Sequence, residues 1–267
     1  MSALAVVGNV ACDLVDGGPP RVGGGPFYAA MALRVLARPA RILTRCSSAD
    51  RAALLPDLIA LGVPVTWREA ETTSTFGIRY DGERRFMHVE AVGHRWTPAD
   101  GRDPALADAS AVHVAPLLRS DFPPETLAEL ARGRRLSLDG QGLVRPGRTG
   151  ELVLDADFDP AVLRHVSVLK LAEEEAHAVL GDVNHGSVAE LGVPEVLVTF
   201  GPRGSIVYAD GDETFVRANE VANDDPTGAG DAYSTAYLAA RSTGAAPVAA
   251  ARRATALVEG LLAGRLR

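Results

Sequence analysis

The chain has 267 residues, 47% of them hydrophobic and 23% charged, which is enough to bury a core and excludes an intrinsically disordered chain. Its 27 basic and 34 acidic residues give a net charge of −7, so it lacks the basic field that binds nucleic acid or an anionic membrane surface. No apolar run approaches the roughly 18 residues of a membrane span. Cys12 and Cys46 lack zinc spacing, so we expect reduced thiols in a cytoplasmic protein.

Short apolar runs and helix-like segments alternate along most of the chain. The apolar runs predict buried strands at Ala3–Val7, Arg41–Leu43, Ala111–Ala115, Leu136–Leu138, Val166–Lys170 and Val196–Phe200. Amphipathic spacing predicts helices at Phe27–Leu36, Arg51–Leu61, Pro124–Ala131 and Ala172–Leu180. Because strands that alternate with helices form parallel sheets, the sequence predicts an α/β fold with a mostly parallel central sheet.

Two hairpins interrupt this alternation. Period-2 patterning around Asp81-Gly82 predicts the first over 75–89, as a flap laid on the sheet, and a turn at 210–212 predicts the second over 205–217, as an antiparallel edge. From Gly228 onward the sequence predicts two helices, Ala229–Ser242 and Pro247–Leu262. Since no linker or repeat is present, we expect one domain over 1–267 with a small lid at about 73–91.

The sharpest local motif is Asp225-Pro-Thr-Gly-Ala-Gly-Asp231, which runs directly into predicted helix. Small residues at 228–230 let backbone N–H groups converge at a helix start, where free donors and the helix dipole attract an anion. Asp231 then lies beside this cradle, where a carboxylate can take the proton of a hydroxyl that attacks a phosphoryl group. The alternative is a glycine-rich turn with an acidic first helical residue.

Other nucleotide-binding fingerprints fail here. The dinucleotide pattern needs glycine where Tyr233 stands, and a Walker A loop needs Gly before Lys170, the one lysine of the chain, where Leu169 stands. A second glycine cluster, Gly23-Gly24-Gly25, precedes a predicted helix, and Asp13 follows the first strand, where a carboxylate can accept from substrate hydroxyls. The alternative for this second cluster is a tight connection with a solvated Asp13.

Together, in this order, these residues resemble the pfkB-type carbohydrate kinases, the ribokinase-like group. The resemblance implies a three-layer fold with helices on both faces of the sheet, ATP as donor and Mg²⁺ as cofactor. It implies that Asp231 is the catalytic base, that the amides of Gly228, Ala229 and Gly230 form the anion hole, and that Asp13 and Gly24 touch the acceptor. The implied nucleotide-binding residues are Thr199, Gly201, Arg203, Gly204 and Thr227.

The chain departs from the family pattern in three places. The Asn-x-x-Glu motif that helps to organise magnesium keeps its acid as Glu175, an indirect metal residue, but has Ala172 in place of Asn. Tyr28 stands where many sugar kinases place an Asn that contacts the substrate. Only nine residues separate Asp13 from Gly23, so we expect a lid reduced to one hairpin and leave monomer or homodimer open.

The segment 138–145, together with Tyr28 and 112–117, is similar to the myo-inositol kinase-like branch. Asp139 follows a strand end, where open α/β sheets place ligands, and Arg145 can hold a phosphate or substrate oxygen through two N–H groups. The alternative for Arg145 is a solvated loop arginine. His113 interrupts an apolar strand, and a buried histidine bonded to the backbone is the preferred interpretation over a site residue.

The sequence thus predicts an ATP-dependent kinase that acts on a hydroxyl of a small sugar or polyol, with a myo-inositol-like acceptor as the best guess. A nucleoside or another sugar is the alternative acceptor within the same family. From other classes, two hypotheses stay open: a Schiff-base aldolase on a (β/α)8 barrel with Lys170 as nucleophile, and a degenerate kinase homologue that only binds ligands.

Overall fold

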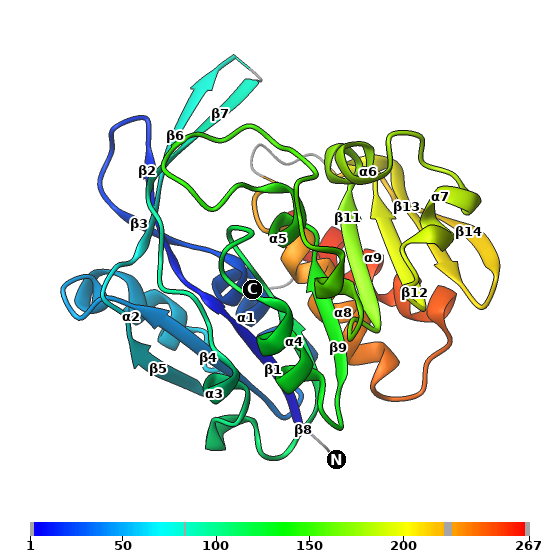
Figure 1. The fold of residues 1–267 in the computed structure, drawn as a ribbon, viewed down its shortest axis with the longest axis horizontal. Helices are drawn as coiled ribbons and strands as arrows, with labels where there is room; N and C mark the ends of the chain where they lie inside the picture. The colour runs from blue at the N-terminus through cyan, green and yellow to red at the C-terminus, as the bar shows by residue number, and fades with distance from the viewer. Residues whose placement is uncertain (1–2, 83, 222–225, 265–267) are drawn as a thin grey trace.

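The computed structural model describes residues 3–82, 84–221 and 226–264, and over these residues it forms an open nine-stranded sheet (Figure 1). The strands lie in the order β14-β13-β12-β11-β9-β8-β1-β4-β5, and every neighbouring pair from β12 to β5 is parallel. The bounds are β1 Ala3–Asn9, β4 Ala40–Cys46, β5 Val65–Glu69, β8 Ala109–Val114, β9 Arg135–Asp139, β11 Val168–Ala172, β12 Glu195–Thr199, β13 Gly204–Ala209 and β14 Asp212–Arg217.

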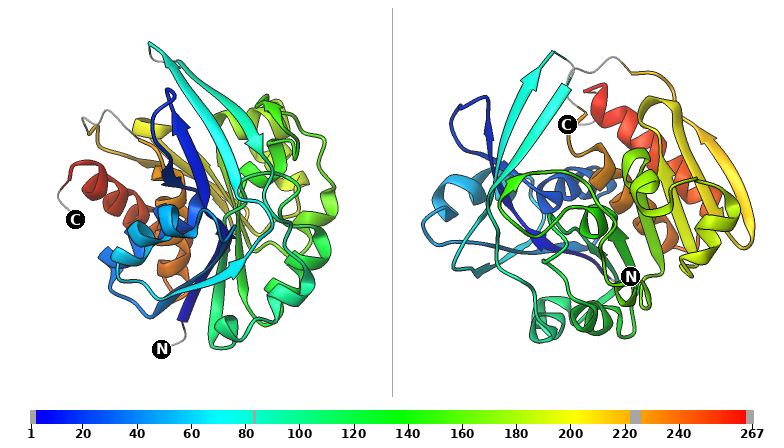
Figure 2. Two further views of the ribbon diagram at one scale, coloured as in Figure 1. Left: turned by 90° about the vertical axis from the view of Figure 1, so that its left-hand side faces the viewer. Right: turned by 45° about the horizontal axis from the view of Figure 1, so that its top comes forward.

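Helices cover both faces of this sheet, so the molecule has three layers (Figure 2). Alternate strand residues divide the core: Leu4 and Val6 pack toward α1 and α2, whereas Ala5 and Val7 belong to the cluster with α4 and α6. The helices are α1 Gly25–Leu36, α2 Arg51–Ala60, α3 Pro98–Gly101, α4 Pro124–Ala131, α5 Gln141–Val144, α6 Glu173–Leu180, α7 His185–Glu190, α8 Ala229–Arg241 and α9 Pro247–Leu262. The predicted mostly parallel sheet is confirmed, and β13 and β14 form the predicted antiparallel edge.

A second, five-stranded sheet stands above the carboxyl ends of the central strands, in the order β10-β7-β6-β2-β3 (Figure 1). The predicted hairpin is its centre, as β6 (Ser74–Asp81) and β7 (Arg84–Ala91). The lid is wider than this hairpin, because β2 (Ala11–Val15) pairs with β6, and β3 (Arg21–Gly23) and β10 (Gly150–Glu151) extend the edges. The hairpin is therefore part of a separate sheet, and the expected flap laid on the central sheet is wrong.

The short connection after β1 suffices for two lid strands because β2 continues directly from β1 and folds back on β3 after a turn at Asp16 and Gly17. Phe76 and Ile78 of β6 pack with Leu118 into a small core of their own. No helix in the described part of the chain is long and apolar enough to cross a bilayer.

A buried ion network holds α8 against β12. The Glu195 carboxylate, 7% exposed, accepts hydrogen bonds from the Tyr237 hydroxyl at 2.6 Å, from Arg241 Nη2 at 2.6 Å and from Arg135 Nη1 at 2.9 Å. Since Tyr237 and Arg241 lie near the end of α8, this network fixes the helix whose first turn carries Asp231.

Candidate functional site

A cavity of about 640 Å³ lies between the lid, the carboxyl ends of the central strands and the first turn of α8. It collects most of the residues that the sequence singled out, from segments far apart in the chain. These are Asp13, Gly24, Tyr28, Arg145, Glu175, Thr199, Gly201, Arg203, Thr227, Gly228, Ala229, Gly230 and Asp231.

Some of the singled-out residues do not line this cavity. Asp139 is fully buried and does not line the cavity, because its carboxylate turns to the ammonium of Lys170, which does. The prediction that Asp139 touches substrate is therefore not supported by its position. Gly204 lines a neighbouring apolar pocket rather than this cavity, and Asp225 lies outside the described residues.

The glycine motif forms a tight bend that starts α8. Gly228 has a φ of +79°, and a Cβ on it would meet Cδ1 of Tyr28 at 1.9 Å, so both conformation and space require glycine. The Ala229 N–H donates to the Pro226 carbonyl at 3.1 Å. Gly228 is the N-cap and Gly230 lies in the first turn of α8, where backbone N–H groups have no intrahelical acceptor and can bind an anion.

Asp231 lies in the first turn of α8 and is 8% exposed. Burial raises the pKa of its carboxyl to about 7, a rise to which Asp139 adds, while Lys170 and Arg145 oppose it. Its Oδ1 has no hydrogen-bond partner among the described residues. Such a carboxyl is poised to take a proton near neutral pH.

Lys170 lies near this carboxyl, in the middle of β11. Its Nζ is 3.3 Å from Asp139 Oδ2 and 3.7 Å from Glu175 Oε2. Burial alone would lower the pKa of Lys170, but these carboxylates raise it above its ordinary value. The Glu175 carboxylate also accepts from the Ala172 N–H at 2.7 Å. Lys170 is therefore held as an ammonium, which is the wrong state for a Schiff-base nucleophile.

Asp13 and two arginines, Arg85 and Arg145, also line the cavity. Burial raises the pKa of Asp13 to about 6, against the lowering effect of Arg85 and Arg145. Neither arginine side chain has an ion-pair partner in the described part of the chain. Arg85 and Met87 reach the cavity from β7, and the sequence analysis missed them although strand alternation places both on one face of the hairpin.

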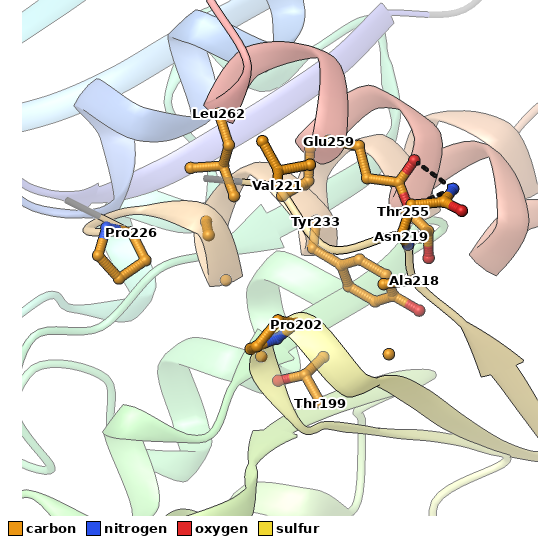
Figure 3. Close-up of a pocket in the computed structure, with 15 residues that line it drawn as sticks. Thr199, Pro202, Ala218, Asn219, Val221, Pro226, Tyr233, Thr255, Glu259 and Leu262 are labelled. Carbon is orange, nitrogen blue, oxygen red and sulfur yellow. Dashed lines mark hydrogen bonds between the residues drawn. The ribbon is translucent and has the colours of Figure 1, made fainter. Parts of the chain in front are cut away.

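A second pocket of about 330 Å³ adjoins the cradle, between the loop that follows β12 and helix α9 (Figure 3). Tyr233, Val258 and Leu262 give it mainly apolar walls, and the Tyr233 hydroxyl lies 2.8 Å from Ser205 Oγ. The pocket shares Thr199, Gly201, Pro202, Pro226, Ala229 and Gly230 with the main cavity. A ligand with a flat apolar group and an anionic tail fits across the two.

His113 is fully buried, and neither ring nitrogen has a hydrogen-bond partner among the described residues. The expected bond to the backbone is therefore wrong. Burial lowers the pKa of His113 to about 4, so the ring stays neutral at physiological pH.

An open α/β sheet with a glycine-rich helix start and a buried carboxylate at its carboxyl edge is suited to phosphoryl transfer to a small molecule. The chain belongs to the pfkB family of carbohydrate kinases, whose sequence model matches residues 22–258. The open sheet and this membership make the barrel aldolase hypothesis wrong.

Among curated relatives, the inositol 3-kinases of Zea mays and Oryza sativa subsp. japonica are each 30% identical over 181 residues. These matches cover 66% and 61% of this chain but only 45% and 43% of the plant proteins, so the chain aligns with less than half of their length.

Solved structures confirm the ribokinase-like fold. A pyrophosphate-dependent kinase of the ribokinase family, complexed with a pyrophosphate analogue and myo-inositol, has a TM-score of 0.85 at 24% identity and covers 97% of this chain and 94% of its own. Arabidopsis thaliana ribokinase, complexed with ribose and ATP, has a TM-score of 0.74 at 19% identity, over 98% of this chain and 92% of its own.

Proposed function

We propose that this protein transfers the γ-phosphoryl group of ATP to one hydroxyl of a small polyol, with a myo-inositol-like acceptor. The observation that carries the proposal is the placement of Asp231 beside Gly228 and Gly230 at the helix start, at the wall of a cavity that lid residues also line. We further propose one cytoplasmic kinase domain with its own lid.

In the proposed reaction, the Asp231 carboxylate takes the proton of the attacking hydroxyl. The hydroxyl oxygen forms a bond to the γ-phosphorus, the bond from that phosphorus to the β–γ bridging oxygen breaks, and ADP leaves. The cradle amides stabilise the negative charge on the transferring group. A base whose pKa is about 7 releases its proton readily once the transfer is complete.

The acceptor side favours a compact molecule rich in hydroxyls. Asp13 accepts from hydroxyls, while Arg85 and Arg145 donate to oxygens from the lid and from the sheet side. The similarity to inositol 3-kinases supports an inositol-like acceptor over a nucleoside. Tyr28 lies against the cradle and narrows the cavity between the two substrates.

Pyrophosphate is the second candidate donor, because the structure with the TM-score of 0.85 is a pyrophosphate-dependent kinase. The apolar pocket beside the cradle supports ATP, since pyrophosphate has no group to fill it. Thr255→Trp, which places an indole in this pocket, should abolish ATP use. If pyrophosphate is the donor, the same substitution should leave turnover within threefold of the wild-type rate.

Magnesium fits this site as a partner of the donor phosphates. In the described part of the chain no three His, Cys, Asp or Glu side chains are grouped to hold a metal by themselves. Glu174 contributes an exposed carboxylate to the cavity wall, whereas Glu175 is engaged by Lys170 and Ala172. When bound, magnesium neutralises part of the phosphate charge.

The decisive experiment is a phosphoryl-transfer screen with Mg²⁺ and either ATP or pyrophosphate, over myo-inositol, ribose, fructose, nucleosides and sugar phosphates. Saturable turnover of a polyol that Asp231→Asn abolishes is the expected result. Binding of donor without turnover of any acceptor would instead favour a degenerate, ligand-binding homologue.

A further inference from the structure

Lys170 is the one lysine of the chain, and the reaction proposed above assigns it no contact with substrate. It lines the cavity and yet is only 4% exposed, with two carboxylates at 3.3 and 3.7 Å from its Nζ. An ammonium carries three N–H donors, so the two carboxylates leave at least one donor without an acidic partner. Burying a charged ammonium costs free energy. A role of Lys170 in binding substrate would explain why a lysine stands at this position.

The free direction of Lys170 faces the cradle. A Cβ placed on Gly230 would lie 2.9 Å from Nζ and 3.3 Å from Cε, so the ammonium sits directly beneath the backbone that presents the Gly230 amide. An anion that accepts from this amide therefore lies within reach of Nζ. Glycine at 230 is required for this approach, because any side chain would displace the lysine.

Lys170 and Ala172 lie on the same face of β11. These residues are two apart on β11, so both project to the same face of the sheet, and both line the cavity. Ala172 stands where the family motif has Asn and offers no polar side-chain atom. Two residues earlier on the same strand, the Lys170 ammonium supplies N–H donors for phosphate oxygens.

We propose that Lys170 is a catalytic residue that donates a hydrogen bond to the transferring phosphoryl group. Asp139 and Glu175 hold the ammonium in place, and Gly230 leaves the space through which it reaches the anion. This inference rests on the proposed function and names a phosphate-contacting group within the same site.

Lys170→Met alone would strand two buried carboxylates, so the test variant is the double substitution Lys170→Met with Asp139→Asn. Asp139→Asn alone, which keeps the ammonium, is the matched control. Removing one donor to the transition-state charge typically lowers kcat by about 10²- to 10³-fold, so we expect that loss in the double variant and less than tenfold in the control. Thermal unfolding establishes that both variants fold.

Binding distinguishes a contact with the transferring group from a structural role. The double variant should bind ADP within threefold of the control but bind ADP with beryllium fluoride, which mimics the γ-phosphoryl group, at least 50-fold more weakly. If pyrophosphate proves to be the donor, the affinity for pyrophosphate is compared with the affinity for phosphate in both variants. A folded double variant that keeps kcat and this affinity within threefold of the control overturns the inference. Wild-type protein that phosphorylates no acceptor with either donor overturns the proposed function instead.

Discussion

Replacing Asp231 with Asn should slow phosphoryl transfer and, at alkaline pH, stabilise the folded protein. A positioned general base contributes about 10²- to 10⁴-fold to the rate, and Asn cannot take the hydroxyl proton. Because Asn has nearly the same size and shape, the substrate constants should change little, and the loss should fall on kcat.

The stability change follows from the environment of the carboxyl. A pKa of about 7 in place of 3.8 means that keeping Asp231 ionised at pH 8 costs at most about 4 kcal/mol relative to the unfolded chain. Since the folded-state pKa is raised, this cost is absent below pH 3.8 and reaches its full value above pH 7. The neutral amide of the Asp231→Asn variant carries no such cost, so the variant should melt at higher temperature at pH 8, with the difference closing toward pH 4.

The assays are steady-state kinetics from pH 5.5 to 9 and thermal unfolding at pH 4, 6 and 8. For the wild type, kcat should rise with pH through about 7 as the base loses its proton. A variant that keeps more than a tenth of wild-type kcat, or that melts below the wild type at pH 8, would refute this reasoning.

Three further outcomes follow from the site and its supports. Asp139→Asn removes a charge that raises the pKa of Asp231, so the acid limb of the kcat profile should move to lower pH; an unmoved limb contradicts the coupling. Gly228→Ala should reduce kcat at least 100-fold, because its Cβ would overlap Tyr28, and a second substitution, Tyr28→Ala, should restore part of the activity. Glu195→Gln weakens the charged hydrogen bonds that anchor α8 and should lower stability by about 2 kcal/mol in urea unfolding; no change would mean that the network contributes little.

Much of the fold could be predicted because buried parallel strands leave a strong local pattern. The predicted helices 124–131 and 247–262 coincide with α4 and α9, and each predicted central strand exists within a few residues. Strands β2, β3, β5 and β10 were missed because they are short and because β2 and β10 pair with strands far away in the chain. Their pairing is a tertiary property that local patterning does not record.

Some parts of the site could likewise be predicted from local sequence, and others could not. The glycine bend before α8 was predictable because glycine and alanine at residues 228–230 indicate a tight backbone turn. The role of Asp139 was not, because its partner Lys170 is adjacent only through the pairing of β9 with β11. Arg85 was missed because nothing in the hairpin pattern says which of its two faces meets the cavity.

The apolar pocket and the main cavity meet at the lining residues that they share. In the proposed function, the apolar pocket binds the donor and the main cavity holds the residues that transfer its phosphoryl group. Substitutions on α9, such as at Leu262 or Val258, alter only the far compartment, whereas Asp231 and its neighbours belong to the near one. Filling or emptying the apolar pocket is therefore expected to change which phosphoryl donor binds while leaving the residues of the transfer step in place.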